Sequence, residues 1–190
     1  MSEFFLRALG VLLSCGFCPL SWSATEMFPR PMLIHRVSEL GLEIWTEARP
    51  EWELRTDIRH GLPVFVAETP ALVVPPAGMT WTSHPGISFT PDELPEGARG
   101  AVLQAARNYH VREPDRLELH AAVYGELSGF EAEFTGDAHG TLVDVLIFCG
   151  HRAGKPAVLM HAYTLKGKLQ QISKHIRRSW THVRYLEQRR

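Results

Sequence analysis

Residues 117–165 read LELHAAVYGELSGFEAEFTGDAHGTLVDVLIFCGHRAGKPAVLMHAYTL, a pattern that predicts four consecutive β-strands. Apolar and polar residues alternate over 117–124 and 130–135, which is typical of strands with one buried face. Residues 142–149 are almost all apolar, as expected for a central strand that is covered on both faces. A last strand is expected at 156–165, and the connections between the strands are short and contain glycine. The segment therefore predicts an antiparallel meander.

The flanking segments add further strands and two helices. Upstream, alternating or β-branched runs predict four strands: 41–47, 51–55, 63–67 and 71–74. Prolines interrupt the last two, so we expect edge strands there. Residues 75–95 contain five prolines and predict a long irregular excursion. Helices with one apolar face are expected at 95–109 and 168–187. The fold class expected is α+β, a central antiparallel sheet with helices packed on it in an α/β/α sandwich.

Charge is divided unevenly along an otherwise ordinary globular composition. The chain has 190 residues, 45% of them hydrophobic, and a net charge of −1, which excludes global disorder and suits one domain. Residues 1–165 hold 12 basic and 20 acidic side chains (net −8), whereas residues 166–190 hold 8 basic and one acidic (net +7). The basic side chains of the closing helix are expected to face solvent: Lys174, Arg177, Arg178 and Arg184. Without interleaved exposed aromatics, this helix does not indicate nucleic-acid binding.

The N-terminus has the features of a targeting segment. Residues 1–24 combine an apolar stretch with small residues before Ala24, which fits a cleaved signal peptide. Two alternatives stay open: Leu12–Cys15 resembles a bacterial lipobox that would make Cys15 a lipidated N-terminus, or the segment is an uncleaved membrane anchor. We therefore expect a protein of the periplasm or one anchored in the inner membrane, in contact with the membrane only through this segment. Residues 25–34 form the expected linker and residues 35–190 a single domain.

Motifs for catalysis or cofactor binding are missing from the folded body, so we expect neither an enzyme, a cofactor nor a metal site. Cys149, His161 and Asp144 lie on strands that are expected to be neighbours and would make a catalytic set if their side chains met. Cys149 ends the most apolar strand, however, which favours a packed thiol. His175 and His182 are two helical turns apart, about 10 Å, too far to share a metal ion.

The stretch from Leu117 to His151 is rich in acidic residues and contains no Lys or Arg. Between Leu117 and His151 the acids are Glu118, Glu126, Glu131, Glu133, Asp137 and Asp144. Acids on adjacent strands repel one another unless solvent or a basic partner compensates them. This pattern predicts a partner-binding surface, with five candidate residues: Glu126, Glu131, Glu133, Asp137 and His139.

The closing half of the chain resembles the PsbP-like group, which includes DcrB-like envelope proteins of bacteria. The resemblance rests on the apolar patterns of four segments: 129–134, 141–148, 156–163 and 176–185. It implies a binding domain whose final helix, with its Ser179-Trp180 pair, packs back on the sheet, and it transfers no functional residues.

By type, a small exported domain of this kind is similar to the immunity proteins of bacterial type VI secretion systems, which block a cognate toxin effector by direct binding. The leading hypothesis is therefore an immunity protein. The alternative is an envelope accessory lipoprotein of the DcrB/PsbP-like kind that supports a membrane complex.

Overall fold

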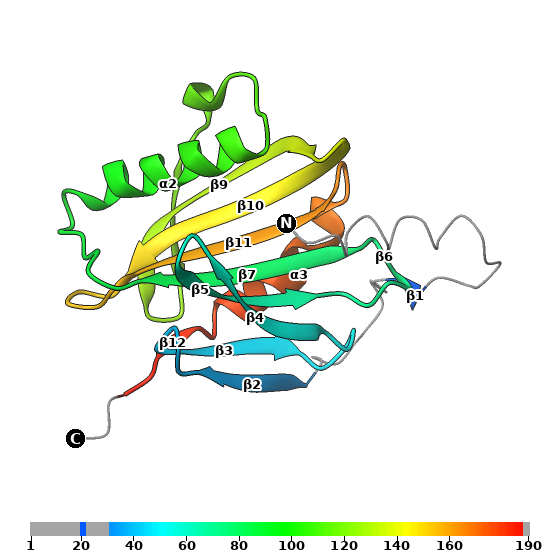
Figure 1. Cartoon of the computed structure of the whole chain (residues 1–190), viewed down its shortest axis with the longest axis horizontal. Coiled ribbons are helices and arrows are strands. Elements are labelled where there is room, and N and C mark those ends of the chain that lie inside the picture. Colours follow the sequence, from blue (N-terminus) through cyan, green and yellow to red (C-terminus); the bar gives the residue numbers. More distant parts are fainter. Residues whose placement is uncertain (1–19, 22–30, 188–190) are drawn as a thin grey trace.

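The computed structural model of this chain describes residues 20–21 and 31–187. Its centre is a sheet of seven strands in the order β4-β5-β7-β11-β10-β9-β8, and every neighbouring pair is antiparallel (Figure 1). The strands are β4 (Glu53–Arg59), β5 (Leu62–Glu68), β7 (Ala77–His84), β8 (His120–Tyr124), β9 (Leu127–Ala138), β10 (Thr141–His151) and β11 (Ala157–Leu165). The last four are adjacent in chain order, which confirms the predicted meander.

A smaller antiparallel sheet packs beside the seven-stranded one. It consists of β2 (Met32–Val37), β3 (Leu42–Glu47) and β12 (Arg184–Tyr185), in the order β12-β3-β2. A short parallel pair joins β1 (Leu20–Ser21) to β6 (Val73–Val74). Strand β2 begins at Met32, inside the segment predicted to be a linker. The folded body therefore takes in the end of that segment.

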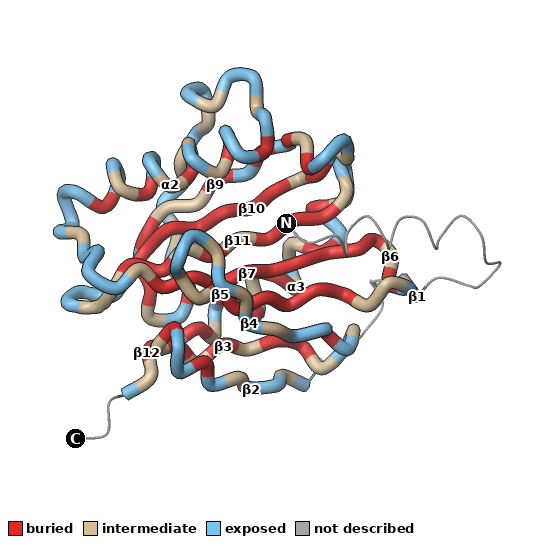
Figure 2. Tube along the Cα trace, in the orientation of Figure 1, coloured by how far each residue is buried: buried red, intermediate tan, exposed pale blue. Residues whose placement is uncertain are grey.

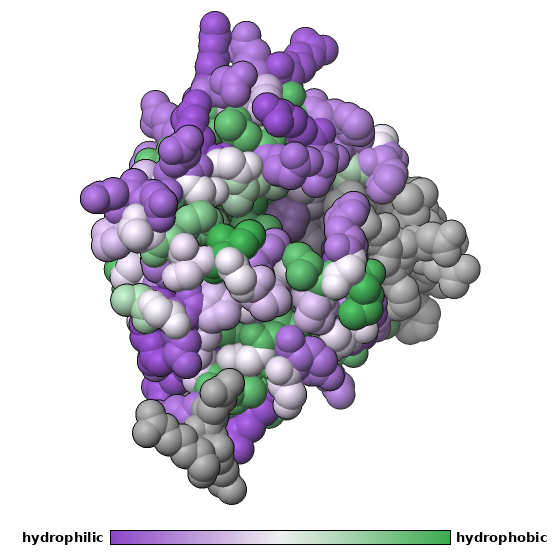
Figure 3. Space-filling view, turned by 60° about the vertical axis from the view of Figure 1, so that its left-hand side comes forward, coloured by the Kyte–Doolittle hydropathy of each residue, from purple (hydrophilic) through white to green (hydrophobic). Residues whose placement is uncertain are grey.

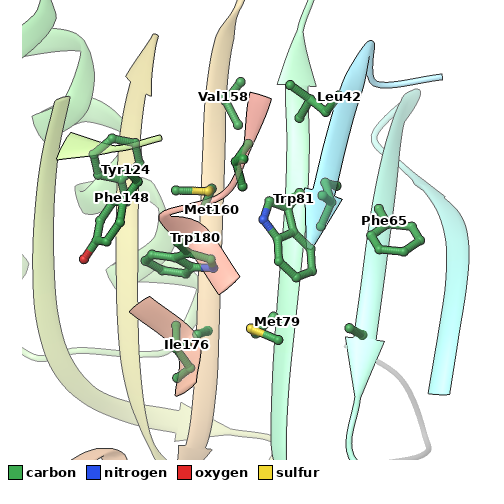
Figure 4. Close-up of a cluster of buried hydrophobic side chains, with 14 of the residues drawn as sticks. Leu42, Phe65, Met79, Trp81, Tyr124, Phe148, Val158, Met160, Ile176 and Trp180 are labelled. Atoms are coloured by element: carbon green, nitrogen blue, oxygen red, sulfur yellow. The ribbon is translucent and has the colours of Figure 1, made fainter. Parts of the chain in front are cut away.

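Two helices cover opposite faces of the large sheet. Helix α3 (Leu169–Trp180) and the small sheet enclose the main core, in which Trp180 and Trp81 are completely buried (Figure 4). Helix α2 (Leu94–Asn108) contributes Val102 and Ala106 to a second cluster with β9 and β10 on the other face. The inner strands are buried along most of their length, whereas exposed residues alternate along β4 (Figure 2). The α+β fold expected from the sequence is confirmed.

The predicted excursion at 75–95 is wrong, because it contains a central strand. Strand β7 pairs with both β5 and β11. Pro75, Pro76 and Pro85 lie just outside it and leave an uninterrupted run from Ala77 to His84. Strand β5 is for the same reason an inner strand and not an edge, and its ladder to β7 begins at Val64, after Pro63.

The closing helix is shorter than predicted. Helix α3 ends at Trp180, where the hydroxyl of Thr181 donates to the carbonyl of Arg177 at 2.7 Å. The chain then turns, and β12 pairs with Leu42 and Glu43 of β3. Val183, which falls within the predicted helix, is buried but belongs to this turn. Pairing with the small sheet thus ends a helix that the apolar periodicity would have continued.

Candidate functional site

Three of the meander's carboxylates line a cleft on the α3 side of the sheet. The cleft has a volume of about 560 Å³ and is lined by Glu118, Glu131, Glu133, Arg116, His120 and Arg177, together with Leu117 and Ala132. Glu131 lies opposite His120 in the β8–β9 ladder, and Glu133 follows on the same face of β9. We call this feature the acidic cleft.

Arg177 of α3 compensates part of the negative charge in the acidic cleft. Its Nη1 atom donates to Oε2 of Glu131 at 2.7 Å, and its Nη2 atom donates to Oε1 of Glu133 at 2.9 Å. The guanidinium also donates to the hydroxyl of Tyr124, which itself donates to Oε2 of Glu131 at 2.5 Å. Burial and this bond to Glu131 raise the pKa of Tyr124. The expectation that Arg177 faces solvent is therefore wrong, and the meander acids have a basic partner within the same chain.

Arg178 likewise turns inward. Its Nη1 atom donates to Oε1 of Glu47 at 3.0 Å, and the Nδ1 atom of His175 lies 2.8 Å from the other oxygen of the same carboxylate. Glu47 is buried on β3, so this pair of contacts ties α3 to the small sheet. Lys174 remains exposed, as the sequence predicted.

The structure brings only two of the five predicted partner-binding residues together. Glu131 and Glu133 share the acidic cleft, whereas Glu126 and His139 lie in the turns before and after β9, and Asp137 lies near the end of β9. Glu126 accepts from Arg152 at 2.9 Å and from the Tyr185 backbone at 3.3 Å. Asp137 accepts from the Gly140 N–H at 2.6 Å, and His139 adopts a φ of 54° in the same turn. Asp137 thus stabilises the β9–β10 hairpin.

A second hollow lies on the opposite face of the sheet, between α2 and strands β5, β7, β10 and β11. We call it the α2 cavity; its volume is about 660 Å³. Its apolar lining includes Leu62, Val64, Ile147, Leu159 and Phe89. Figure 3 shows this side of the molecule, with a depression flanked by hydrophobic side chains. Pockets of this size with mostly apolar walls are typical of small-molecule sites.

Polar groups without a protein partner lie in the wall of the α2 cavity. The hydroxyl of Tyr109 and the Nε2 atom of His161 are both buried and accept or donate no hydrogen bond within the described residues. The two rings are 5.4 Å apart. Burial lowers the pKa of His161 to about 4, and the positive charge of Arg59 acts in the same direction. His161 is therefore neutral at pH 7.

Cys149 and His161 face the α2 cavity together, but Asp144 does not. Ile147 pairs with His161 across the β10–β11 ladder, and Cys149 is two residues along on the same face. Asp144, an odd number of residues away, points to the α3 face and accepts from Thr135 and Gly167. Burial raises the pKa of Cys149 to about 11, so its thiol is protonated. This arrangement lacks the paired base and activated thiolate of a cysteine nucleophile.

Among the described residues no group of three His, Cys, Asp or Glu side chains is arranged to hold a metal ion. No helix in the described ranges is long and apolar enough to cross a membrane.

Sequence reasoning missed the α2 cavity because its wall comes from six separate elements: α2 and strands β4, β5, β7, β10 and β11. The available signal was His161, a polar residue within the apolar run of β11. Nothing in the sequence indicated that Tyr109, at the end of α2, would meet it.

Comparison with known proteins adds information on the fold. No family model matches the chain, and no curated protein matches it by sequence. A crystal structure from Bacteroides thetaiotaomicron superposes with a TM-score of 0.51 at 12% identity over 85% of this chain and 50% of that one, so this chain spans half of that protein.

Two further structures match less closely. LpqN of Mycobacterium tuberculosis, which is involved in cell envelope biogenesis, superposes with a TM-score of 0.44 at 12% identity, over 87% of this chain and 88% of LpqN. PA94 of Pseudomonas aeruginosa, a protein of unknown function described as a putative regulator, gives 0.44 at 11% identity, over 79% and 94% of the two chains. At these identities the similarity concerns the fold alone.

Proposed function

We propose that this chain is an immunity protein that binds and neutralises a cognate secreted toxin without catalysis, and that it holds a basic side chain of the toxin in the acidic cleft. The observation that carries the proposal is the excess of carboxylates there. Glu118, Glu131 and Glu133 line the cleft, and Arg177 supplies one compensating charge. Arg116, the other cation at its edge, pairs with Glu113 at 2.9 Å.

The three carboxylates differ in how far they are available to a partner. The Glu131 side chain is 13% exposed and is held by Arg177 and Tyr124, whereas the Glu133 side chain is 40% exposed. Glu118 is exposed at the rim. We therefore assign Glu131 to positioning Arg177, and Glu118 and Glu133 to contact with the toxin. Charge complementarity of this kind speeds association and selects the partner.

Absence of an activated catalytic group in the described cavities supports a binding role. Cys149 is a protonated thiol, and Asp144 lies on the other face of the sheet from His161. We further propose that the chain belongs to the PsbP-like and DcrB-like group and acts outside the cytoplasm. Cell fractionation of the tagged full-length protein tests the location, and recovery only in the cytosolic fraction would contradict it.

The test of the proposed function starts from the genes next to this one. Each neighbouring reading frame is expressed, and the one whose product arrests growth is paired with the full-length chain. We expect the chain to restore growth and to bind the toxin in titration calorimetry. Failure of the wild-type chain to restore growth in every pairing would overturn the proposal.

Two matched variants locate the interface. Glu118→Gln combined with Glu133→Gln should weaken toxin binding about tenfold or more at low salt, because two of the cleft carboxylates lose their charge. The melting temperature should change little, since neither side chain is buried. Glu96→Gln, an exposed change on α2, is the control and should bind like wild type. Unchanged affinity of the double variant would remove the acidic cleft from the interface.

A further inference from the structure

We propose that the α2 cavity is a binding site for a small amphipathic carboxylate, a molecule with an apolar chain or ring and one carboxylate group. This site lies on the opposite face of the sheet from the acidic cleft and is independent of toxin binding.

The size and lining of the α2 cavity fit the apolar body of such a ligand. Its volume of about 660 Å³ lies within the range of small-molecule sites. Helix α2 lines it with three small residues, Gly97, Ala101 and Ala105, and with the amide side chains of Gln104 and Asn108, which hydrogen-bond to each other. Leu62 and Ile147 line it from the sheet. Because the side chains of Gly97, Ala101 and Ala105 are too short to fill the space between the helix and the strands, a ligand can occupy that space.

Two unsatisfied polar atoms fix where the head group goes. Tyr109 is 3% exposed, yet its hydroxyl has no hydrogen-bond partner within the described residues, and neither has the Nε2 atom of His161. An unpaired buried polar group costs about 1–3 kcal/mol, so buried polar atoms in folded proteins are nearly always paired. A ligand that accepts hydrogen bonds from the Tyr109 hydroxyl and from neutral His161 in its Nε2–H tautomer would remove this cost.

Arg59 lines the α2 cavity, and no acidic residue is among its lining residues, which favours a carboxylate over a neutral or basic head group. Arg59 at the end of β4 acts electrostatically on Tyr109, Tyr163 and His161, so the potential at this end of the α2 cavity has a positive contribution. Arg59 is held by Asp57 at 3.3 Å, and Asp57 also binds Arg55 at 3.1 Å. Arg55 in turn binds Glu68 at 2.6 Å, and Glu68 accepts from Tyr163. Asp57 therefore holds Arg59 in place, but its carboxylate is shared between the guanidinium groups of Arg59 and Arg55.

Isothermal titration of the full chain with decanoate, 2-naphthoate and decanol tests the proposal. Decanoate has an alkyl chain and 2-naphthoate an aromatic ring. Whichever of the two binds more tightly shows whether a fatty acid or an aryl carboxylate fits the α2 cavity better. Decanol has the chain of decanoate without the charge and should bind about tenfold more weakly or worse. Equal binding of decanol and decanoate, or no binding of any probe up to about 1 mM, would overturn the assignment.

Three variants connect binding to the named atoms. Tyr109→Phe removes only the unpaired oxygen, so it should keep or raise the melting temperature while it weakens carboxylate binding several-fold. Arg59→Gln should weaken decanoate about tenfold and leave decanol unchanged. Ala101→Leu should block the apolar body and weaken all probes. Arg99→Gln, an exposed change on α2, is the control. If both Tyr109→Phe and Arg59→Gln bound decanoate with the affinity of the wild type, the carboxylate would not lie beside these two side chains, and the assignment would be overturned.

Discussion

A single side chain, His161, carries much of the pH response that this structure implies. It lies against Tyr109 and Tyr163, with ring centroids 5.4 and 5.9 Å away, and burial together with Arg59 lowers its pKa from 6.5 to about 4. Between these two values the unfolded chain takes up a proton that the folded protein does not. Stability contributed by neutral His161 is therefore complete above about pH 6.5 and is lost as the pH falls towards 4.

Replacing His161 should flatten this acid response. We expect the unfolding free energy of the wild type to fall between about pH 7.5 and pH 4.5, with at most about 3 kcal/mol of the loss due to His161. His161→Gln should lose correspondingly less, and His120→Gln, at an exposed position, should behave as the wild type. Urea unfolding at the two pH values measures the difference. Equal losses in the wild type and His161→Gln would mean that the folded protein protonates this ring readily.

At this scale the sequence predicted residue types better than residue contacts. The apolar stripe of α3 was correctly identified, because a period of 3.6 residues reports which side chains lie on one face. Arg177 and Arg178 were predicted to face solvent, because the helical period does not report which carboxylates the neighbouring strands place beside the helix. Glu131, Glu133 and Glu47 lie more than 40 positions away in the chain, and their pairing with these arginines depends on how the sheets are placed.

The junction between α2 and β9 is held by close contact of two backbones. The N–H of Asp137 donates to the carbonyl of Tyr109, the C-cap residue of α2, at 2.6 Å. A Cβ atom on Gly136 would lie 2.5 Å from the Cβ atom of Tyr109 and 2.6 Å from its carbonyl oxygen. Glycine at position 136 is therefore what allows the end of the helix to bond to the strand, and this bond fixes Tyr109 in the wall of the α2 cavity.

Two glycine substitutions should have opposite effects on this element. Gly136→Ala should destabilise the protein by about 1–3 kcal/mol, because the added methyl group forces the helix end away from β9. Gly100→Ala, on the exposed side of α2 with no atom within 4 Å of the new methyl group, should stabilise by about 0.5–1 kcal/mol through the helical preference of alanine. Chemical denaturation of both variants tests the pair. A neutral Gly136→Ala would show that the helix end yields without cost.

Strand β7 shows where pattern reading fails at the level of elements. Prolines at 75, 76 and 85 suggested an irregular segment, yet they flank the strand, so no ladder hydrogen bond is lost. The meander was predictable because each of its turns is local. The insertion of β7 between β5 and β11 was not, since the residues of β7 and β11 are paired across some 80 positions of chain. The insertion of β7 brings the lining residues of β5 and of β11 onto one sheet, so the α2 cavity could not be predicted without it.

The two faces of the large sheet are packed unequally. Helix α3 buries Leu169, Ile172, Ile176 and Trp180 against strands and the small sheet, and Glu47 ties it down through Arg178. Helix α2 buries two alanines, Ala98 and Ala106, together with Leu94 and Val102. Burying a large apolar side chain contributes about 1.5–3 kcal/mol, far more than burying an alanine. The α2 layer is therefore the less stable of the two.

We expect α2 to open without unfolding the rest of the molecule. Native-state hydrogen exchange should give α2 amides an opening free energy at least about 2 kcal/mol below that of β10, whereas α3 should exchange with β10. Val102→Ala should lower protection in α2 alone, and Ile176→Ala should lower it throughout, because Ile176 lies in the shared core. A carboxylate in the α2 cavity would raise α2 protection selectively, since it binds only while the helix is seated on the sheet. Uniform protection of α2, α3 and β10 would mean that both faces unfold as one unit.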